Sequence, residues 1–207
     1  MQRTPTGLRS PGWNIGDDAV AILLRRGYLY DSSIFPTSLT PLLKFLHWRT
    51  MAKRDAPDRT TLGQLAYMLA PATPYKTSKH SLLRRGNDGI VELPVTVTPV
   101  VRLPFFATFL LSTGFRLFEN SYRLLKAARR PIQFQFHLSD FVDYRNPLLA
   151  DQVPIPGQGQ YVPKALLMPL AEKLDLFQRA IDLIAQDYTF VTCKQAALRI
   201  SDAAATE

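Results

Sequence analysis

Residues 132–138 constrain the possible fold more than any other segment, because their hydrophobicity alternates with a period of two. Apolar and polar side chains take turns along the segment, with Ile132, Phe134, Phe136 and Leu138 on one face and Gln133, Gln135 and His137 on the other. This alternation predicts a β-strand with one buried face and one polar face. In α/β folds the carboxyl ends of strands carry the chemistry, and His137 lies at that end. His137 is therefore the leading candidate for a functional group, and Asp140 and Asp143 are close enough in sequence to orient it.

The rest of the chain alternates between predicted strands and predicted helices. Strands are expected over residues 6–9, 28–33, 89–97 and 188–192. Helices are expected over residues 17–26, 105–128, 163–187 and 194–199. This alternation indicates an α/β fold with a parallel sheet. We expect one domain over residues 1–200, with residues 34–89 as a long helical insertion or lid after the second strand, and a flexible tail over 201–207.

The composition of the 207-residue chain is that of a globular protein, with 46% hydrophobic and 20% charged residues. Its net charge of +8 is spread over short basic pairs and forms no long tract. Because no aromatic platform accompanies these pairs, we expect no nucleic-acid partner. The most apolar stretch, Leu103–Phe115, is too short to span a bilayer, and the N-terminal residues do not resemble a signal peptide. The sequence thus predicts a protein that is soluble and cytoplasmic or peripheral to a membrane.

Polar and aromatic residues follow the first two predicted strands. An arginine such as Arg9 can hold a carboxylate, and an aromatic residue such as Trp13 can stack on a sugar, although both also fit an ordinary surface loop. Asp31 ends the second strand, where a simple turn is the alternative. A structural role is likewise the alternative for His137. The single cysteine, Cys193, follows a predicted buried strand and is expected to be a small core side chain.

Two features that suggest a metal site have simpler interpretations. Asp17 and Asp18 are adjacent, but they follow Gly16 and open a helix, where carboxylates favour the positive end of the helix dipole. The chain has three histidines, and no pair of them has the spacing of metal ligands. The sequence also contains no nucleophile elbow and no phosphate-binding glycine loop. No metal ligands are therefore expected within this chain.

Taken in order, several segments resemble the polysaccharide deacetylase family, the NodB-like carbohydrate deacetylases. The resemblance extends from about residue 8 to residue 192 and is carried by the order and spacing of its pieces. The segments that resemble family motifs are Leu8-Arg9-Ser10-Pro11-Gly12-Trp13, Gly27-Tyr28-Leu29-Tyr30-Asp31-Ser32-Ser33, Glu92-Leu93-Pro94-Val95 and Phe136-His137-Leu138. The resemblance implies an incomplete (β/α) barrel of the NodB-like type.

The same resemblance implies hydrolysis of an N-acyl group from an amino sugar of a glycan, with a divalent metal such as zinc. It implies that His137 is the catalytic acid, that Asp31 tunes it, and that Arg9 holds the catalytic base. Trp13 and Pro11 are then expected to line the substrate groove. The family's first two motifs, an Asp-Asp pair and a His-x-x-x-His, would precede Arg9 and are missing here. The chain is thus expected to be the C-terminal part of such an enzyme, inactive unless another chain supplies the missing half.

Two alternatives belong to other functional classes. The chain could be a non-catalytic carbohydrate-binding or accessory protein that keeps the groove wall around Trp13. It could also be a basic peripheral membrane protein in which Leu39–Trp48 and Leu103–Phe115 contact lipid.

Overall fold

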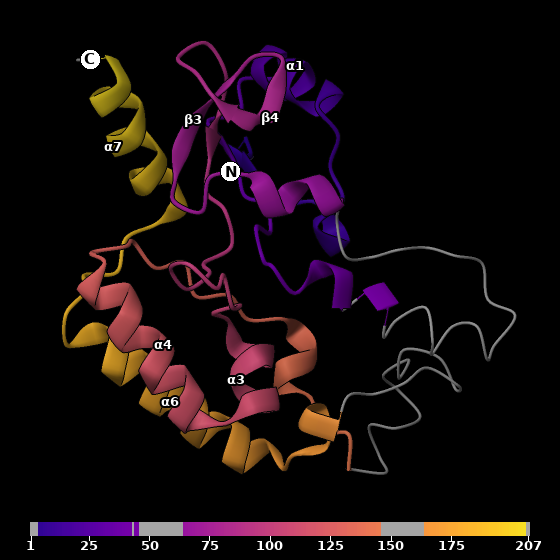
Figure 1. Ribbon diagram of the computed structural model, residues 1–207, viewed down its shortest axis with the longest axis vertical. Coiled ribbons are helices and arrows are strands. Elements are labelled where there is room, and N and C mark those ends of the chain that lie inside the picture. Colours follow the sequence, from indigo (N-terminus) through magenta and orange to yellow (C-terminus); the bar gives the residue numbers. More distant parts are fainter. Residues whose placement is uncertain (1–3, 43, 46–63, 146–163, 206–207) are drawn as a thin grey trace, which may run out of the picture. The chain divides into compact units, whose positions relative to one another are not determined.

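The computed structural model describes residues 4–42, 44–45, 64–145 and 164–205, which form a mixed α/β structure (Figure 1). The chain divides into two compact units. Unit 1 consists of Met1–Leu103 and Phe190–Glu207, and unit 2 consists of Pro104–Thr189. Each unit has a hydrophobic core of its own and is described by itself.

Unit 1 is built on a five-stranded sheet with the strand order β1-β2-β5-β3-β4. The strands are β1 (Gly7–Leu8), β2 (Tyr30–Asp31), β3 (Tyr75–Ser78), β4 (Ser81–Arg85) and β5 (Val91–Glu92). Strands β1, β2 and β5 are parallel, and their register aligns Leu8 with Asp31 and Asp31 with Glu92. Strand β3 runs antiparallel to both β5 and β4. The predicted α/β class is confirmed. The predicted parallel arrangement holds for β1, β2 and β5, and the strands described do not close into a barrel.

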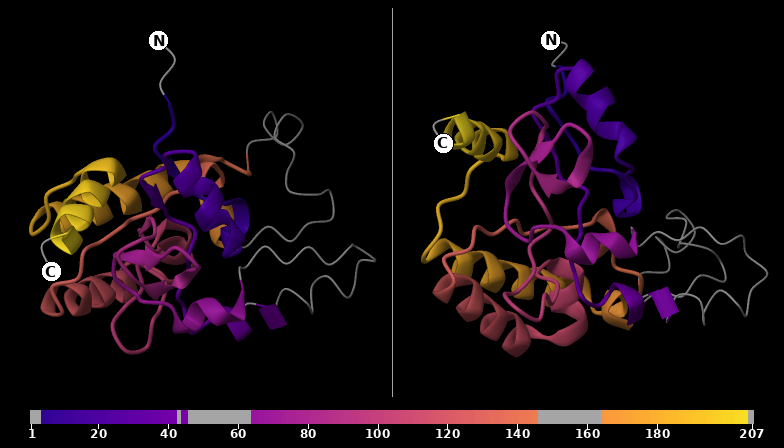
Figure 2. Two further views of the ribbon diagram at one scale, coloured as in Figure 1. Left: turned by 90° about the horizontal axis from the view of Figure 1, so that it is seen from above. Right: turned by 45° about the horizontal axis from the view of Figure 1, so that its top comes forward.

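Two helices cover the sheet of unit 1, which Figures 1 and 2 show with the β3–β4 hairpin between them. Helix α1 (Asp18–Arg25) contributes Val20 and Leu23 to a core that includes Ile90. Helix α7 (Cys193–Ala205) packs Ala197 against Val91 and Leu93. Ile90 packs with α1, and its neighbour Val91 packs with α7. Because successive strand residues point to opposite faces, the two helices lie on opposite faces of the sheet.

The start and end of α1 agree with the sequence. Asp17 and Asp18 open the helix, and the Oδ1 atom of Asp17 accepts a hydrogen bond from the backbone N–H of Leu82 at 2.8 Å, which ties the helix to β4. Gly27 follows the helix with a φ of +72°, a conformation that glycine adopts without strain. Unit 1 also contains two 3-10 segments, η1 (Pro11–Trp13) and η2 (Leu65–Leu69).

Unit 2 is helical in its described residues. Its helices are α3 (Ala107–Thr113), α4 (Phe115–Ala127) and α6 (Leu170–Ala185), with 3-10 turns η3 (Leu138–Phe141) and η4 (Lys164–Leu167). Helices α4 and α6 lie side by side (Figures 1 and 2) and meet through residues spaced three or four apart, which produces one buried stripe on each helix. The buried stripes are Phe118, Tyr122 and Leu125 on α4, and Phe177, Ala180 and Ile184 on α6.

The prediction of a strand over residues 132–138 is wrong. The alternation itself is present, because Ile132, Phe134 and Phe136 pack against the core of unit 2. However, no described segment of unit 2 is a strand that could pair with this one, and the segment runs as irregular backbone. One backbone hydrogen bond, from the N–H of Ala107 to the carbonyl of Gln135 at 2.9 Å, fastens it to the start of α3. His137 is therefore not at the end of a sheet strand.

Other differences concern where elements begin and end. The helix predicted over 105–128 is two helices, separated at Gly114 with φ +83° and ψ 166°. The strand predicted over 188–192 is not formed, and Cys193 is exposed at the start of α7 because no core covers it. Helix α7 continues to Ala205, so most of the predicted tail is helical.

The predicted insertion over residues 34–89 is described in part. Its described residues include the β3–β4 hairpin, which joins the sheet through β3 and β5, so this part of the insertion belongs to the core of unit 1. Residues 46–63, including Trp48, lie outside the described part of the chain. The other segment considered for lipid contact contains α3, whose Leu110 and Leu111 are buried in unit 2. Among the helices described, none has the length and apolar character needed to cross a bilayer.

Candidate functional site

Arg9 directly follows β1, and its guanidinium group binds the turn after β2. Its Nε donates to the carbonyl oxygen of Ser32 at 2.9 Å, and its Nη2 donates to the Ser32 hydroxyl at 2.6 Å. Burial lowers the pKa of Arg9, and the neighbouring groups Cys193, Glu92 and Asp31 oppose that shift. Through these two hydrogen bonds, Arg9 connects the end of β1 to the turn that follows β2.

Asp31 is fully buried at the end of β2, and Ser33 satisfies its carboxylate. The two oxygens accept hydrogen bonds from the backbone N–H of Ser33 at 3.0 Å and from its hydroxyl at 2.8 Å. The Ser33 hydroxyl oxygen in turn accepts the backbone N–H of Ser10 at 2.7 Å. Asp31 therefore organises the loops that follow β1 and β2.

Glu92 is a third polar residue at this edge, and sequence reasoning did not select it as a site residue. It is aligned with Asp31 across the parallel strands β2 and β5, is fully buried, and accepts the backbone N–H of Ile34 at 3.1 Å. Burial, and next the negative charge of Asp31, raise the pKa of Glu92 well above its usual value. Glu92 therefore keeps its proton to a higher pH than an ordinary glutamate does, as one member of a close carboxyl pair does. A charged residue inside the strand predicted over residues 89–97 was the available signal.

The side chains of Arg9 and Asp31 leave neighbouring strands towards opposite faces of the sheet. Both residues lie at the carboxyl ends of neighbouring parallel strands, as the sequence predicts. Successive residues of a strand point to opposite faces, and Leu8 shares a face with Asp31. Arg9 therefore points to the other face, the one that α7 covers.

Pro11 and Trp13 form the short turn η1 after Arg9. Trp13 has a positive φ of 55°, and its ring lies 4.8 Å from the ring of Phe35, measured between centroids. The Ser10 hydroxyl donates to the carbonyl of Asn14 at 2.6 Å and closes the turn. Trp13 is thus half-buried against Phe35, and its role as a groove wall stays a prediction.

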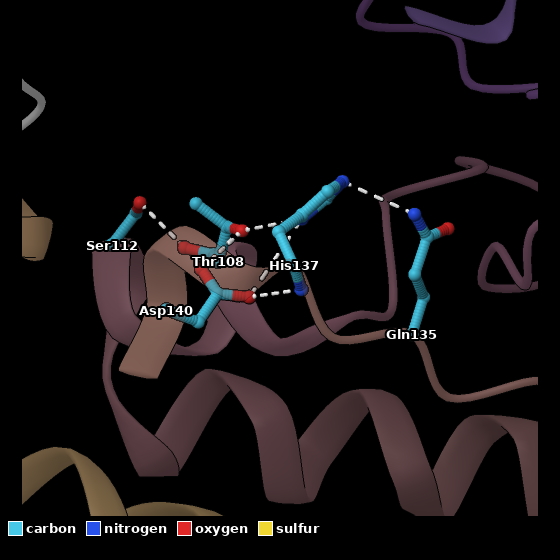
Figure 3. Close-up of polar contacts among 5 residues, drawn as sticks. All are labelled: Thr108, Ser112, Gln135, His137 and Asp140. Atoms are coloured by element: carbon cyan, nitrogen blue, oxygen red, sulfur yellow. Dashed lines mark hydrogen bonds and ion pairs between the residues drawn. The ribbon is translucent and has the colours of Figure 1, made fainter. Parts of the chain in front are cut away.

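His137 belongs to unit 2, where hydrogen bonds connect it to α3 and to the turn η3 (Figure 3). The Thr108 hydroxyl lies 3.2 Å from His137 Nδ1 and donates to Asp140 Oδ1 at 2.8 Å. Asp140 Oδ2 accepts the backbone N–H of His137 at 2.7 Å. Asp140 therefore contacts the backbone of His137 directly and its ring through Thr108, and a role in orienting the ring stays a prediction. Asp143 instead accepts the backbone N–H of Arg145 at 3.1 Å.

The hydrogen bonds favour the tautomer of His137 that carries its proton on Nδ1. A threonine hydroxyl has one proton, and Thr108 donates it to Asp140, so the hydroxyl oxygen accepts from Nδ1–H. The other ring nitrogen, Nε2, then accepts from the side-chain amide of Gln135 at 3.1 Å. Gln135 therefore donates to the ring through its amide nitrogen. Its amide oxygen is buried without a hydrogen-bond partner.

The imidazole of His137 lies between a buried carboxylate and an aromatic ring. Asp140 is fully buried, whereas the His137 side chain is 36% exposed. Asp140 Oδ2 lies 3.7 Å from His137 Nδ1, and the Thr108 hydroxyl connects Asp140 Oδ1 to the same ring nitrogen. Phe106 approaches the ring edge-on, with 6.0 Å between centroids. Thr108 and Gln135 were not predicted; Thr108 is 29 residues away in sequence, so no local signal could have revealed it.

The residues described do not fit the divalent metal that the resemblance implies. Asp31 uses both oxygens to accept hydrogen bonds from Ser33, Glu92 holds a proton, and both ring nitrogens of His137 have partners. Within the described ranges, no three His, Cys, Asp or Glu side chains come together as a metal-binding group.

Comparison with known proteins found no relative: no protein-family profile, no curated protein and no solved structure matches this chain. The assignment of function therefore depends on the geometry and on the motifs in the sequence.

Proposed function

We propose that the chain provides the proton-donating part of a carbohydrate N-deacetylase, an enzyme that hydrolyses the amide between an acyl group and an amino sugar. The observation that carries the proposal is the chain of hydrogen bonds from buried Asp140 through Thr108 to the part-exposed imidazole of His137. This arrangement is typical of a histidine that acts as a general acid. The order of the sequence motifs supports the choice of substrate.

The role of His137 in this reaction is to protonate the leaving nitrogen. An amide nitrogen leaves as a neutral amine, so it must gain a proton as the carbon–nitrogen bond breaks, while the oxygen of water ends on the acyl carbon. In this role the imidazole first takes up a second proton from solvent at Nε2, and it holds that proton once the Gln135 amide turns its oxygen towards the ring. The substrate nitrogen then replaces Gln135 and takes the proton.

The residues described do not supply the other groups that the reaction needs. The metal that the resemblance implies polarises an amide carbonyl when bound, and in this proposal another polypeptide segment supplies its ligands. The parallel strands β1, β2 and β5 are then part of an incomplete (β/α) barrel that this segment completes. The resemblance assigns Arg9 and Asp31 supporting roles, but their contacts with Ser32 and Ser33 support a structural part, so the proposal does not depend on them.

The proposal is tested by purifying the chain from its source cells, through an affinity tag, together with the polypeptides that accompany it. With zinc added, this preparation is expected to release acetate from N-acetylated amino-sugar oligomers. Absence of acetate release across a panel of such oligomers would contradict the proposal.

A non-catalytic carbohydrate-binding role is the second candidate. It is favoured by one observation: both ring nitrogens of His137 already have hydrogen-bond partners within unit 2. Binding of the same oligomers by the same preparation, without acetate release, would support this role in place of the first.

A further inference from the structure

Lys173 is a fully buried lysine on α6, in the core of unit 2. Its ammonium group donates to the carbonyl oxygen of Val142 at 2.9 Å and lies 5.4 Å from the centre of the Tyr144 ring. Lysine is rarely buried without a compensating partner, because moving a cation out of water is costly. The partners of Lys173 all come from the segment that directly follows η3.

The charged groups that act on Lys173 belong to η3 and to the segment that follows it. Asp140 and Asp143 are the carboxylates whose charges act on it, and burial, which they oppose, lowers the pKa of Lys173. Asp140 is also the buried carboxylate that binds the backbone of His137 and the hydroxyl of Thr108. Asp140 thus bonds to the backbone of His137, and its charge also acts on Lys173, which binds the carbonyl of Val142 two residues further on.

We propose that Lys173 is a positioning residue that sets the proton affinity of His137 through Asp140. The negative charge of Asp140 favours the protonated imidazole, and the nearby positive charge of Lys173 weakens this effect. By binding the Val142 carbonyl, Lys173 also holds the turn that carries Asp140 in place. The imidazole then releases its proton more readily to a leaving amine. This inference rests on the proposed function of His137 as a proton donor.

The test replaces Lys173 with methionine, whose side chain keeps the apolar stem and loses the charge. The pKa of His137 is followed by NMR titration of its ring protons, which are assigned with a His137→Gln variant. Lys173→Met is expected to raise that pKa by about half a unit or more, because charges separated by a few ångströms of protein interact with energies on this order. Asp140→Asn is expected to shift the pKa in the opposite direction.

A second variant and a matched control make the result specific. Lys173→Gln keeps a donor for the Val142 carbonyl without the charge, and it is expected to raise the pKa of His137 even where Lys173→Met does not fold. Arg179→Met removes an exposed cation from the same helix, one that pairs with Asp175, and is expected to leave that pKa unchanged. An unchanged or lowered pKa of His137 in the Lys173 variants would overturn the inference, as would an Arg179→Met shift of equal size. Because the readout is a pKa and not acetate release, this inference and the proposed function can fail separately.

Discussion

Glu92 shows how burial changes the chemistry of one carboxyl group. The side chain lies beside Asp31 in unit 1, and burial raises its pKa well above the usual value. Above pH 4 to 5 the unfolded chain loses the proton of Glu92 while the folded chain keeps it. The unfolded state then binds fewer protons, so this residue lowers the stability of the protein as pH rises towards the pKa of the folded state.

Glu92→Gln is therefore expected to stabilise unit 1, because glutamine keeps an acceptor for the N–H of Ile34 and cannot ionise. The gain in free energy of unfolding is expected to grow by about 1.4 kcal/mol per pH unit between the unfolded and folded pKa values. Urea unfolding at pH 5, 6.5 and 8 measures it. Asp18→Asn, at an exposed position of the same unit, is the control and is expected to show no such growth. A gain that is constant with pH would contradict a protonated Glu92.

Position 7 has room only for glycine, because the ring of Tyr30 packs against the backbone of β1 there. A Cβ atom placed on Gly7 would lie 1.9 Å from Tyr30 Cζ, far closer than atoms can approach. Gly7→Ala is expected to cost about 1–3 kcal/mol of stability, since the ring must move. In the Tyr30→Ala background the cost should largely disappear, because the ring is gone. Equal costs in both backgrounds, measured by urea unfolding, would rule out this contact as the cause.

Among the elements, the break between α3 and α4 depends on a single backbone conformation. Gly114 has φ +83° and ψ 166°, a region that is essentially restricted to glycine. Gly114→Ala is expected to destabilise unit 2 by about 1–3 kcal/mol, although no atom lies near enough to clash with the new methyl group. Thermal unfolding measures the effect. Gly16→Ala is the matched control: it also has open space and no positive φ, and it should have little effect.

The segment 132–138 shows what a sequence pattern can and cannot predict about an element. The alternation correctly placed Ile132, Phe134 and Phe136 against the core, but Leu138, assigned to the same face, is exposed. It could not indicate a sheet, because a strand exists only if a partner strand lies beside it, and the partner is a property of distant sequence. The β3–β4 hairpin was missed for a related reason: its strands are short, and β4 ends in the charged pair Arg84 and Arg85.

Helix boundaries were easier to predict where capping residues and glycines mark them. Helix α1 begins at the predicted carboxylates and ends before Gly27. In contrast, the sequence pattern over residues 105–128 predicts one amphipathic helix, because apolar residues recur through it without interruption. Only the backbone conformation of Gly114 reveals that two helices are present.

At the scale of the whole molecule, the predicted site residues are divided between the two compact units. Sequence reasoning placed Arg9, Asp31 and His137 at one edge of one sheet, whereas Arg9 and Asp31 belong to unit 1 and His137 to unit 2. The pairing of β1 with β2 was predictable, because consecutive parallel strands are commonly neighbours. The contact of His137 with Thr108 was not predictable, since it depends on how α3 packs within unit 2.

The account depends most on His137 as the proton donor, and one kinetic comparison tests this directly. Acetate release from an N-acetylated amino-sugar oligomer is measured for the native preparation, for His137→Ala and for His80→Ala, which changes an exposed histidine of unit 1. We predict that His137→Ala lowers kcat about 100-fold or more with little change in KM, as expected for loss of a general acid, and that His80→Ala retains full activity. A His137→Ala preparation that turns over substrate as fast as the His80→Ala preparation would contradict the account.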